Sequence, residues 1–206
     1  MELLKTIQRT LINKIKNMKI LKHKNLNKKI WDNNDLLKKP VADVLMLVAR
    51  SYIDSIREAQ HLNIEFSDVG DVCVYGSIAN YFYTKQSDID LCIALDFDYV
   101  INKNTKAIVN EQNFRLYYYN WAMTHRCRIY GRKVDVSIKD VKKLFCGDRY
   151  CSGPWFSVMK NEWLFKPTII SDTEFKKICS EAKDIYKQII QEFHRVKRDG
   201  FKTYVC

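Results

Sequence analysis

The sequence predicts an α/β fold of the α+β type, in which a small mixed β-sheet is flanked by helices. Helices are indicated by apolar residues that recur every three or four positions after Pro40 and again after Ser171. Strands are indicated by short runs of β-branched and aromatic residues over 71–75, 87–95 and 126–138. With 206 residues, the chain can bury one core without disulfide or metal staples.

Residues 1–39 are predicted to form a basic helix followed by a linker. Apolar residues recur at helical spacing up to about residue 20, namely Leu4, Ile7, Leu11, Ile15 and Met18. Residues 25–39 are rich in Asn and Lys, with Trp31 as the one apolar anchor. Most of the formal net charge of +11 lies in residues 1–39, which favours a polyanionic partner for this arm.

Residues 40–206 are predicted to form one domain. Pro40 suits the first position of a helix whose apolar stripe comprises Val41, Val44, Leu45, Val48, Tyr52 and Ile56. Gly76 ends the first strand, and Tyr130-Gly131-Arg132 interrupts 126–138 as the turn of a hairpin. Ser171 and Glu174 form a capping box at the start of a long C-terminal helix, which we expect to pack behind the sheet.

Acidic residues and a Gly-Ser pair lie in these predicted strands or next to them. Asp88 and Asp90 are two apart in a predicted strand, so both carboxylates lie on one face. Adjacent carboxylates repel each other unless a cation lies between them, and oxygen ligands suit Mg²⁺. Asp135 lies between Val134 and Val136 in a later strand. Gly76 allows close backbone approach to a ligand, and Ser77 offers a hydroxyl and an amide to phosphate.

Together these residues resemble the nucleotidyltransferase superfamily typified by DNA polymerase beta, the CCA-adding enzymes and kanamycin nucleotidyltransferase. In that superfamily a Gly-Ser pair is followed, about ten residues later, by Asp-x-Asp, and a third acidic residue lies on a later strand. The resemblance covers residues 70–140 and implies that Asp88, Asp90 and Asp135 are catalytic residues that hold two Mg²⁺ ions, with Mn²⁺ as an alternative. It also implies that Gly76 and Ser77 bind a nucleoside triphosphate.

The wider sequence resembles small stand-alone nucleotidyltransferase-domain proteins of tailed bacteriophages. The resemblance rests on Trp31, on 76–81 and on the aromatic and proline residues of 153–167. A bacteriophage origin would imply a protein of the host cytoplasm or of the virion.

Several assignments stay open at this point. Asp96 and Asp140 are alternatives to Asp135, although Asp96 and Asp98 are also typical of a loop cap. Lys85, Arg132 and Lys133 could bind a triphosphate or could simply be solvated surface residues. The aromatic residues 117–121 could stack on a base or belong to the core, and the single residues His125 and His194 are typical of structural histidines.

We therefore expect a metal-dependent nucleotidyltransferase that moves a nucleoside monophosphate from a triphosphate to an acceptor hydroxyl, with RNA the favoured acceptor. One alternative is a non-enzymatic nucleic-acid-binding or virion-associated protein, and another is transfer to a protein or small molecule. The chain lacks an apolar run of membrane-spanning length and a secretory signal, so we expect a cytoplasmic protein. Seven scattered cysteines without a Cys-x-x-Cys pair fit a reducing compartment.

Overall fold

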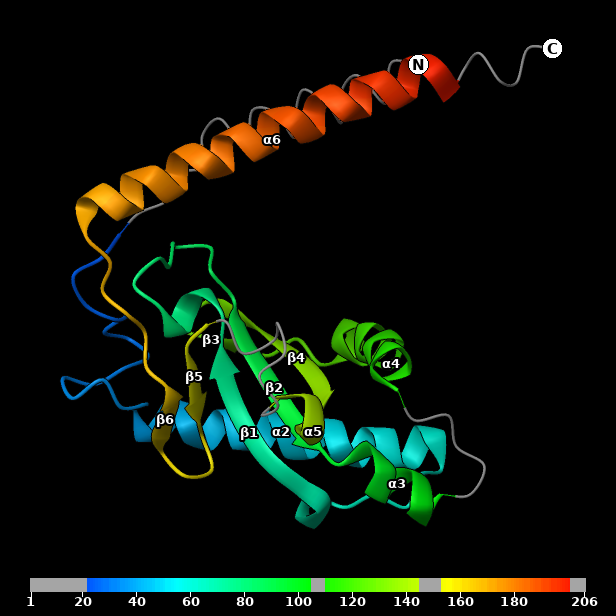
Figure 1. Cartoon of the computed structure of the whole chain (residues 1–206). Helices are drawn as coiled ribbons and strands as arrows, with labels where there is room; N and C mark the ends of the chain where they lie inside the picture. The colour runs from blue at the N-terminus through cyan, green and yellow to red at the C-terminus, as the bar shows by residue number, and fades with distance from the viewer. Residues whose placement is uncertain (1–21, 105–109, 145–152, 201–206) are drawn as a thin grey trace. The chain divides into compact units, whose positions relative to one another are not determined.

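A computed structural model describes residues 22–104, 110–144 and 153–200, and they belong to two compact units (Figure 1). The first unit ends at Thr168 and contains the sheet. The second begins at Ile169 and contains helix α6 (Asp172–Gly200), which was predicted to belong to one domain with the sheet. The helix predicted over residues 1–20 lies outside the described residues.

In the described part of the chain, six strands form one mixed sheet. Their spatial order is β3 (Arg128–Ile129), β4 (Arg132–Asp140), β2 (Ile89–Leu95), β1 (Val69–Tyr75), β5 (Trp155–Ser157) and β6 (Glu162–Phe165). Strands β2 and β4 are parallel, and every other neighbouring pair is antiparallel. A parallel pair needs a long crossover, which here contains helices α3 (Phe97–Lys103) and α4 (Glu111–Thr124). The predicted fold class is confirmed.

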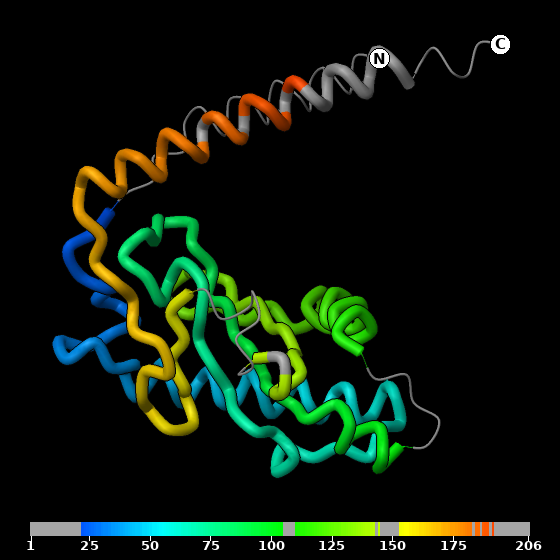
Figure 2. Tube along the Cα trace, in the orientation of Figure 1, coloured from blue at the N-terminus to red at the C-terminus, as the bar shows by residue number. Residues whose placement is uncertain are grey.

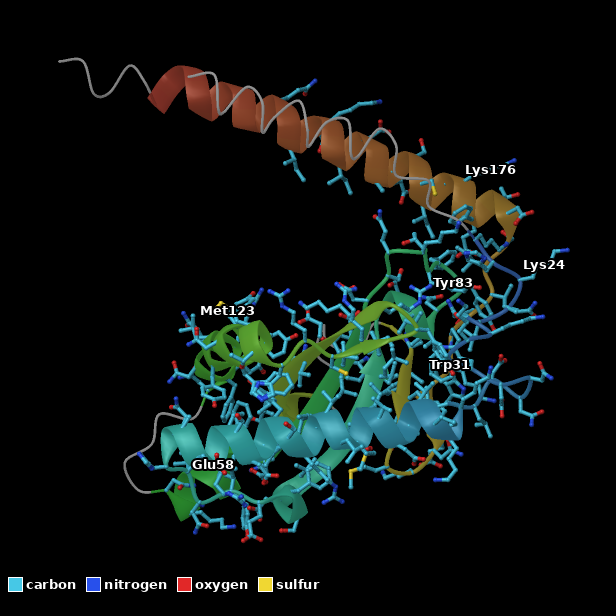
Figure 3. The ribbon with its side chains drawn as sticks, turned by 180° about the vertical axis from the view of Figure 1, so that it is seen from behind. Lys24, Trp31, Glu58, Tyr83, Met123 and Lys176 are labelled. Atoms are coloured by element: carbon cyan, nitrogen blue, oxygen red, sulfur yellow. The ribbon has the colours of Figure 1, made fainter. Side chains whose placement is uncertain are left out.

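Helix α2 (Lys39–Gln60) supplies much of the apolar core of the first unit. It begins with Pro40 in its first turn, as predicted, and crosses the sheet in Figure 1. In the opposite view of Figure 3, α2 lies in front of the strands. Its inward stripe packs with the apolar faces of β1, β2 and β4, while Val44 is 37% exposed. Burial of this stripe joins helix and sheet into one core.

The segment before α2 is part of this core, and its assignment as a linker is corrected. Its buried apolar residues are Leu26, Ile30, Trp31 and Leu37. The Trp31 indole nitrogen donates a hydrogen bond to the Ile78 carbonyl at 2.9 Å, and its ring stacks on Trp163 at 4.8 Å. Figure 2 shows this blue segment beside the yellow segment that contains β5 and β6. The Asn and Lys residues between these apolar side chains gave the segment the composition of a linker.

The predicted hairpin turn is confirmed, and so is the Ser171 half of the predicted capping box. Tyr130 and Gly131 have φ of 49° and 79°, which is typical of a two-residue hairpin turn with both central residues in the left-handed region. The Ser171 hydroxyl accepts a hydrogen bond from the Glu174 amide at 3.1 Å, immediately before α6. No helix among the described residues is both long enough and apolar enough to cross a membrane.

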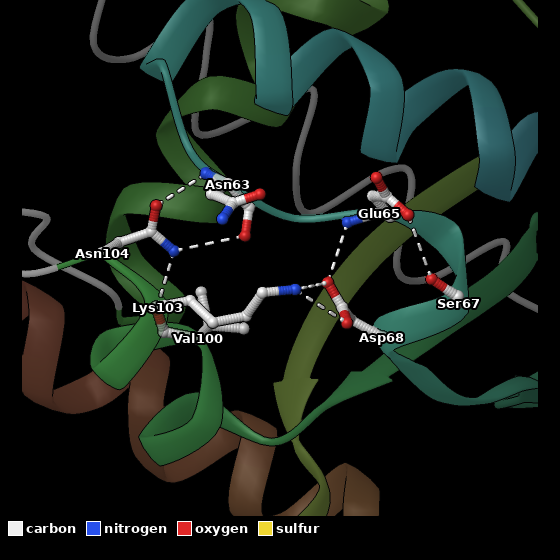
Figure 4. A network of polar contacts seen from close by, with 7 residues as sticks. All are labelled: Asn63, Glu65, Ser67, Asp68, Val100, Lys103 and Asn104. Atoms are coloured by element: carbon white, nitrogen blue, oxygen red, sulfur yellow. Dashed lines mark hydrogen bonds and ion pairs between the residues drawn. The ribbon is translucent and has the colours of Figure 1, made fainter.

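A polar network fixes one end of the sheet (Figure 4). The Lys103 ammonium donates to both carboxylate oxygens of Asp68, at 3.1 and 2.9 Å, and the Glu65 amide donates to the same carboxylate. Partial burial alone would raise the pKa of Asp68, but these hydrogen bonds lower it. The network ties the short 3₁₀ turn Phe66–Asp68, which leads into β1, to α3. It therefore stabilises the end of β1 that is remote from Tyr75.

Candidate active site

Two of the predicted acidic residues lie side by side on the parallel strands β2 and β4. Asp90 pairs in register with Asp135, so their side chains share one face of the sheet. Their neighbours in sequence, including Ile89 and Val134, point into the apolar core. The alternation that buries these neighbours therefore turns both carboxylates toward the opposite face.

The environment of Asp90 disfavours negative charge. Burial raises the pKa of Asp90, and the nearby carboxylates of Asp135 and Asp88 raise it further, to about 6. Lys133 opposes this effect only in part. A bound cation would remove the repulsion, so this pair of oxygen donors suits a hard divalent ion such as Mg²⁺.

Asp88 lies just outside the strand that carries Asp90. Strand β2 begins at Ile89, two residues later than the predicted strand 87–95, and Asp88 is exposed. The loop before it is held by Arg132, whose guanidinium donates to the Thr84 and Ser87 carbonyls at 2.9 and 2.6 Å. Among the described residues, no three acidic, His or Cys side chains gather closely enough to hold a metal ion. A complete three-carboxylate site thus stays a prediction.

Gly76 and Ser77 connect β1 to the site. Gly76 has φ of 76°, and a β-carbon there would overlap the Asp90 carboxylate. The exposed Ser77 begins a single 3₁₀ turn, Ser77–Ala79. Ile78 and Ala79 are fully buried and anchor this turn in the core.

The three predicted basic residues differ in their surroundings. The Lys133 ammonium lies 3.3 Å from Asp135 Oδ1, next to the paired carboxylates. Arg132 supports the loop before Asp88, as described above. Lys85 is exposed and, like Arg132, lines a second pocket. Binding of a nucleotide by these residues stays a prediction.

A cavity of about 780 Å³ opens over Asp90 and Asp135, and α4 forms part of its wall. Sequence reasoning missed Arg115, which lines this cavity and donates from Nε to the Tyr119 hydroxyl at 3.1 Å. Tyr118 and Trp121 are buried in the core, whereas Tyr119 is 52% exposed; Tyr118 and Tyr119 both line the cavity. Which of these aromatic side chains reach the cavity depends on how α4 packs.

Tyr75 lies beside Asp90 on the neighbouring strand β1 and was also missed. Its ring stacks on Trp155 at 4.5 Å, and its hydroxyl lies 3.3 Å from the Ser137 hydroxyl on β4. Burial raises the pKa of Tyr75 to about 12, so the phenol stays protonated at neutral pH. A pocket of about 290 Å³ continues from Tyr75 along Gly76 and Ser77. The sequence offered only an aromatic residue before glycine as a signal.

The remaining candidates lie away from this pair. Asp96 Oδ1 accepts a hydrogen bond from the Tyr99 amide at 3.1 Å and caps α3, as its position suggested. Asp140 lies opposite Leu95, at the other end of β4 from Asp135. His125 stacks on Trp121 and bonds to its carbonyl, which is a structural role. The side chain of His194 lies outside the described residues.

Comparison with known proteins identifies one family. Residues 26–138, more than half of the chain, match the family described as "Poly(A) RNA polymerase, mitochondrial-like, central palm domain". The match contains Gly76, Ser77, Asp88, Asp90 and Asp135. No curated protein and no solved structure matches the chain. The bacteriophage resemblance thus stays a prediction. The chain belongs to the family of the central palm domain of mitochondrial-like poly(A) RNA polymerases.

Proposed function

We propose that the protein is a metal-dependent nucleotidyltransferase that transfers a nucleoside monophosphate from a nucleoside triphosphate to an acceptor hydroxyl, with RNA as the acceptor. The observation that carries the proposal is the register pairing of Asp90 with Asp135 beside the Gly76 turn. Membership of a poly(A) RNA polymerase family supports both the reaction class and the acceptor.

In the proposed reaction, the oxygen of the acceptor hydroxyl forms a bond to the α-phosphorus. The bond from that phosphorus to the bridging oxygen breaks, pyrophosphate leaves, and the hydroxyl proton passes to solvent. Gly76 leaves room for the triphosphate beside Asp90, and the Ser77 hydroxyl donates a hydrogen bond to it. Lys133 offers positive charge next to the carboxylates.

Asp88 and Asp90 would hold the divalent cations, and Asp135 would complete the site of the cation on the acceptor side. Hard oxygen donors and the raised pKa of Asp90 support this assignment. When bound, Mg²⁺ lowers the pKa of an acceptor hydroxyl and neutralises charge on the triphosphate. Two ions are expected in this reaction class, and Mn²⁺ is the alternative metal.

The test is transfer of label from α-³²P-labelled nucleotides to total RNA in the presence of Mg²⁺. We expect the wild-type protein to label RNA, and Asp90→Asn to abolish the transfer. Asp135→Asn should still bind the metal–triphosphate complex but lose turnover, the behaviour of a group that acts mainly in the transition state. Asp140→Asn, an acidic residue at the other end of β4, is the matched control and should retain activity.

Failure with all four nucleotides and with RNA, protein and small-molecule acceptors would reject the enzymatic proposal. The rival function, a nucleic-acid-binding protein without activity, would then explain a basic surface on a palm fold. Labelling of protein or of a small molecule alone would reject RNA as the acceptor.

A further inference from the structure

A second pocket of about 640 Å³ in the first unit is strongly basic. One wall is formed by residues 23–29, and the other by residues 83–85 with the tip of the β3–β4 hairpin. We call it the basic groove. Its charged lining residues are Lys24, Lys28, Lys29, Lys85 and Arg132, and none of the described residues that line it is acidic. Figure 3 shows Lys24 and Tyr83 on the same side of the first unit.

The lysines of the basic groove are available to a ligand. Lys24, Lys28, Lys29 and Lys85 are exposed, and none forms an ion pair with another residue in the described part of the chain. Surface lysines elsewhere in the first unit, such as Lys39 and Lys142, have acidic partners at 3.0 and 2.8 Å. Unpaired like charges that share one groove repel one another, and a polyanion would relieve that repulsion.

Aromatic rings accompany this charge. His23 stacks on Tyr83 with ring centroids 3.9 Å apart and nearly parallel planes, and both residues line the basic groove. Tyr130, at the hairpin tip, is 57% exposed and lines it as well. Lysines that follow a backbone, combined with exposed rings on which bases stack, are typical of proteins that bind single strands. A duplex keeps its bases stacked inside and cannot use such rings.

Arg132 connects the basic groove to the loop that precedes Asp88. Arg132 lines the basic groove and holds the Ser87 carbonyl, and Asp88 is the next residue in the chain. Lys133 follows Arg132 and contacts Asp135. A strand in the basic groove would thus run beside the loop of Asp88 and end near Asp90 and Asp135. One wall also begins before the matched family residues, because His23 to Asn25 precede residue 26.

We infer that the basic groove binds the single-stranded 3′ segment of an RNA acceptor and directs its terminal hydroxyl toward Asp90 and Asp135. The direction of the strand rests on the proposed function, whereas binding itself does not. The phosphates would contact Lys24 and Lys85 on the two walls, and a base would stack on Tyr130.

The test measures binding of a fluorescein-labelled 12-nucleotide RNA to the full-length protein by anisotropy, without Mg²⁺ or nucleotide, over a range of salt concentrations. Lys24→Glu/Lys85→Glu should weaken binding at least about tenfold and lower the slope of log K against log salt by about 1.4. Tyr130→Asn should weaken binding about tenfold through lost stacking, and Asn tolerates the positive φ of this turn. Lys166→Glu is the control for Lys85→Glu, because Lys166 is exposed and does not line the basic groove.

A second measurement locates the strand. RNA that carries 4-thiouridine should cross-link to peptides that contain Tyr83 or Tyr130, as read by mass spectrometry. Cross-links confined to residues 1–21, or equal weakening by Lys166→Glu and Lys85→Glu, would overturn the inference. Equal affinity for duplex RNA, or for polyglutamate with no effect of Tyr130→Asn, would reject a single-stranded ligand.

The two proposals fail in different ways. If the basic groove binds RNA as described but no label is transferred under any condition, the proposed function fails and the binding site stands. If label is transferred while the groove variants bind RNA like the wild type, the function stands and the acceptor lies elsewhere.

Discussion

Gly76 lies so close to Asp90 that a β-carbon at position 76 would overlap the Asp90 carboxylate oxygen Oδ2. The two residues belong to the antiparallel pair β1 and β2, in which Tyr75 is opposite Asp90. The absence of a side chain at position 76 therefore leaves room for the Asp90 carboxylate. It also allows the positive φ that ends β1.

We expect Gly76→Ala to destabilise the protein and to abolish nucleotide-dependent thermal stabilisation, with Gly76→Val more severe. The matched control is Gly131→Ala, because Gly131 has a similar positive φ but a β-carbon there meets nothing within 4 Å. The control should cost about 1–2 kcal/mol from backbone strain alone. Gly76→Ala should cost about 1–3 kcal/mol more, because its methyl group overlaps a carboxylate.

Urea unfolding measures both variants, and the double variant Gly76→Ala/Asp90→Ala should recover part of the loss. Equal costs for Gly76→Ala and Gly131→Ala would show that Asp90 does not restrict position 76. Unchanged stabilisation by triphosphates in Gly76→Ala would place the nucleotide elsewhere.

Asp90 should make the metal-free protein less stable as the pH rises from about 4 to about 6. Its folded-state pKa of about 6 exceeds the usual value of about 3.9, so the native state binds more protons in this window. Asp90→Asn removes the destabilising contribution of the ionised carboxylate and should stabilise the protein at pH 7 by about 1–2 kcal/mol, with allowance for partial exposure of the carboxylate.

Urea unfolding between pH 4 and pH 8 measures this effect. Asp43→Asn, which removes an exposed carboxylate paired with Lys39, should change stability by less than about 0.5 kcal/mol. Asp135→Asn should move this loss of stability to lower pH, because one source of repulsion on the Asp90 carboxylate is removed. An identical pH profile for Asp90→Asn and the wild type would contradict the strained-carboxylate interpretation.

Arg132 and Lys133 are neighbours in sequence, but their substitutions should differ in their effect on stability. Arg132→Ala removes the guanidinium that donates to the Thr84 and Ser87 carbonyls and should cost about 1–3 kcal/mol. Lys133→Ala removes a half-exposed contact and should change stability by less than about 0.5 kcal/mol, while it weakens triphosphate binding. Hydrogen exchange of residues 84–88 should increase only in Arg132→Ala. If both variants are equally stable, Arg132 does not hold the loop.

The boundary of the sheet unit can be tested by two deletions. Removal of residues 1–21 should leave a cooperative protein, because the described core begins after them. Removal of residues 1–38 should prevent folding, since it deletes the buried side chains of Leu26, Ile30, Trp31 and Leu37. Each such loss costs about 2–5 kcal/mol, and the sum exceeds typical domain stability. A cooperative thermal transition for residues 39–206 would restore the linker interpretation.

The sequence predicted features that depend on local patterns. The period of apolar residues located α2, Pro40 marked its first turn, and the hairpin turn and the capping box were readable because they need particular residues. Spacing also brought Gly76, Asp90 and Asp135 into one hypothesis, which the register of β1, β2 and β4 supports geometrically.

Contacts between residues distant in the sequence determined the other features of the fold and of the candidate site. The sequence by itself determined which residues could form helices, turns and acidic strands, because these depend on neighbours within a few positions. Only the tertiary structure decided that residues 26–37 are core, because Trp31 packs against Phe156 and Trp163, more than a hundred residues away in the chain. It also brought Arg132 to the loop before Asp88, and Tyr75 and Arg115 to the cavity of the candidate active site, since such contacts depend on which strands and helices meet after folding.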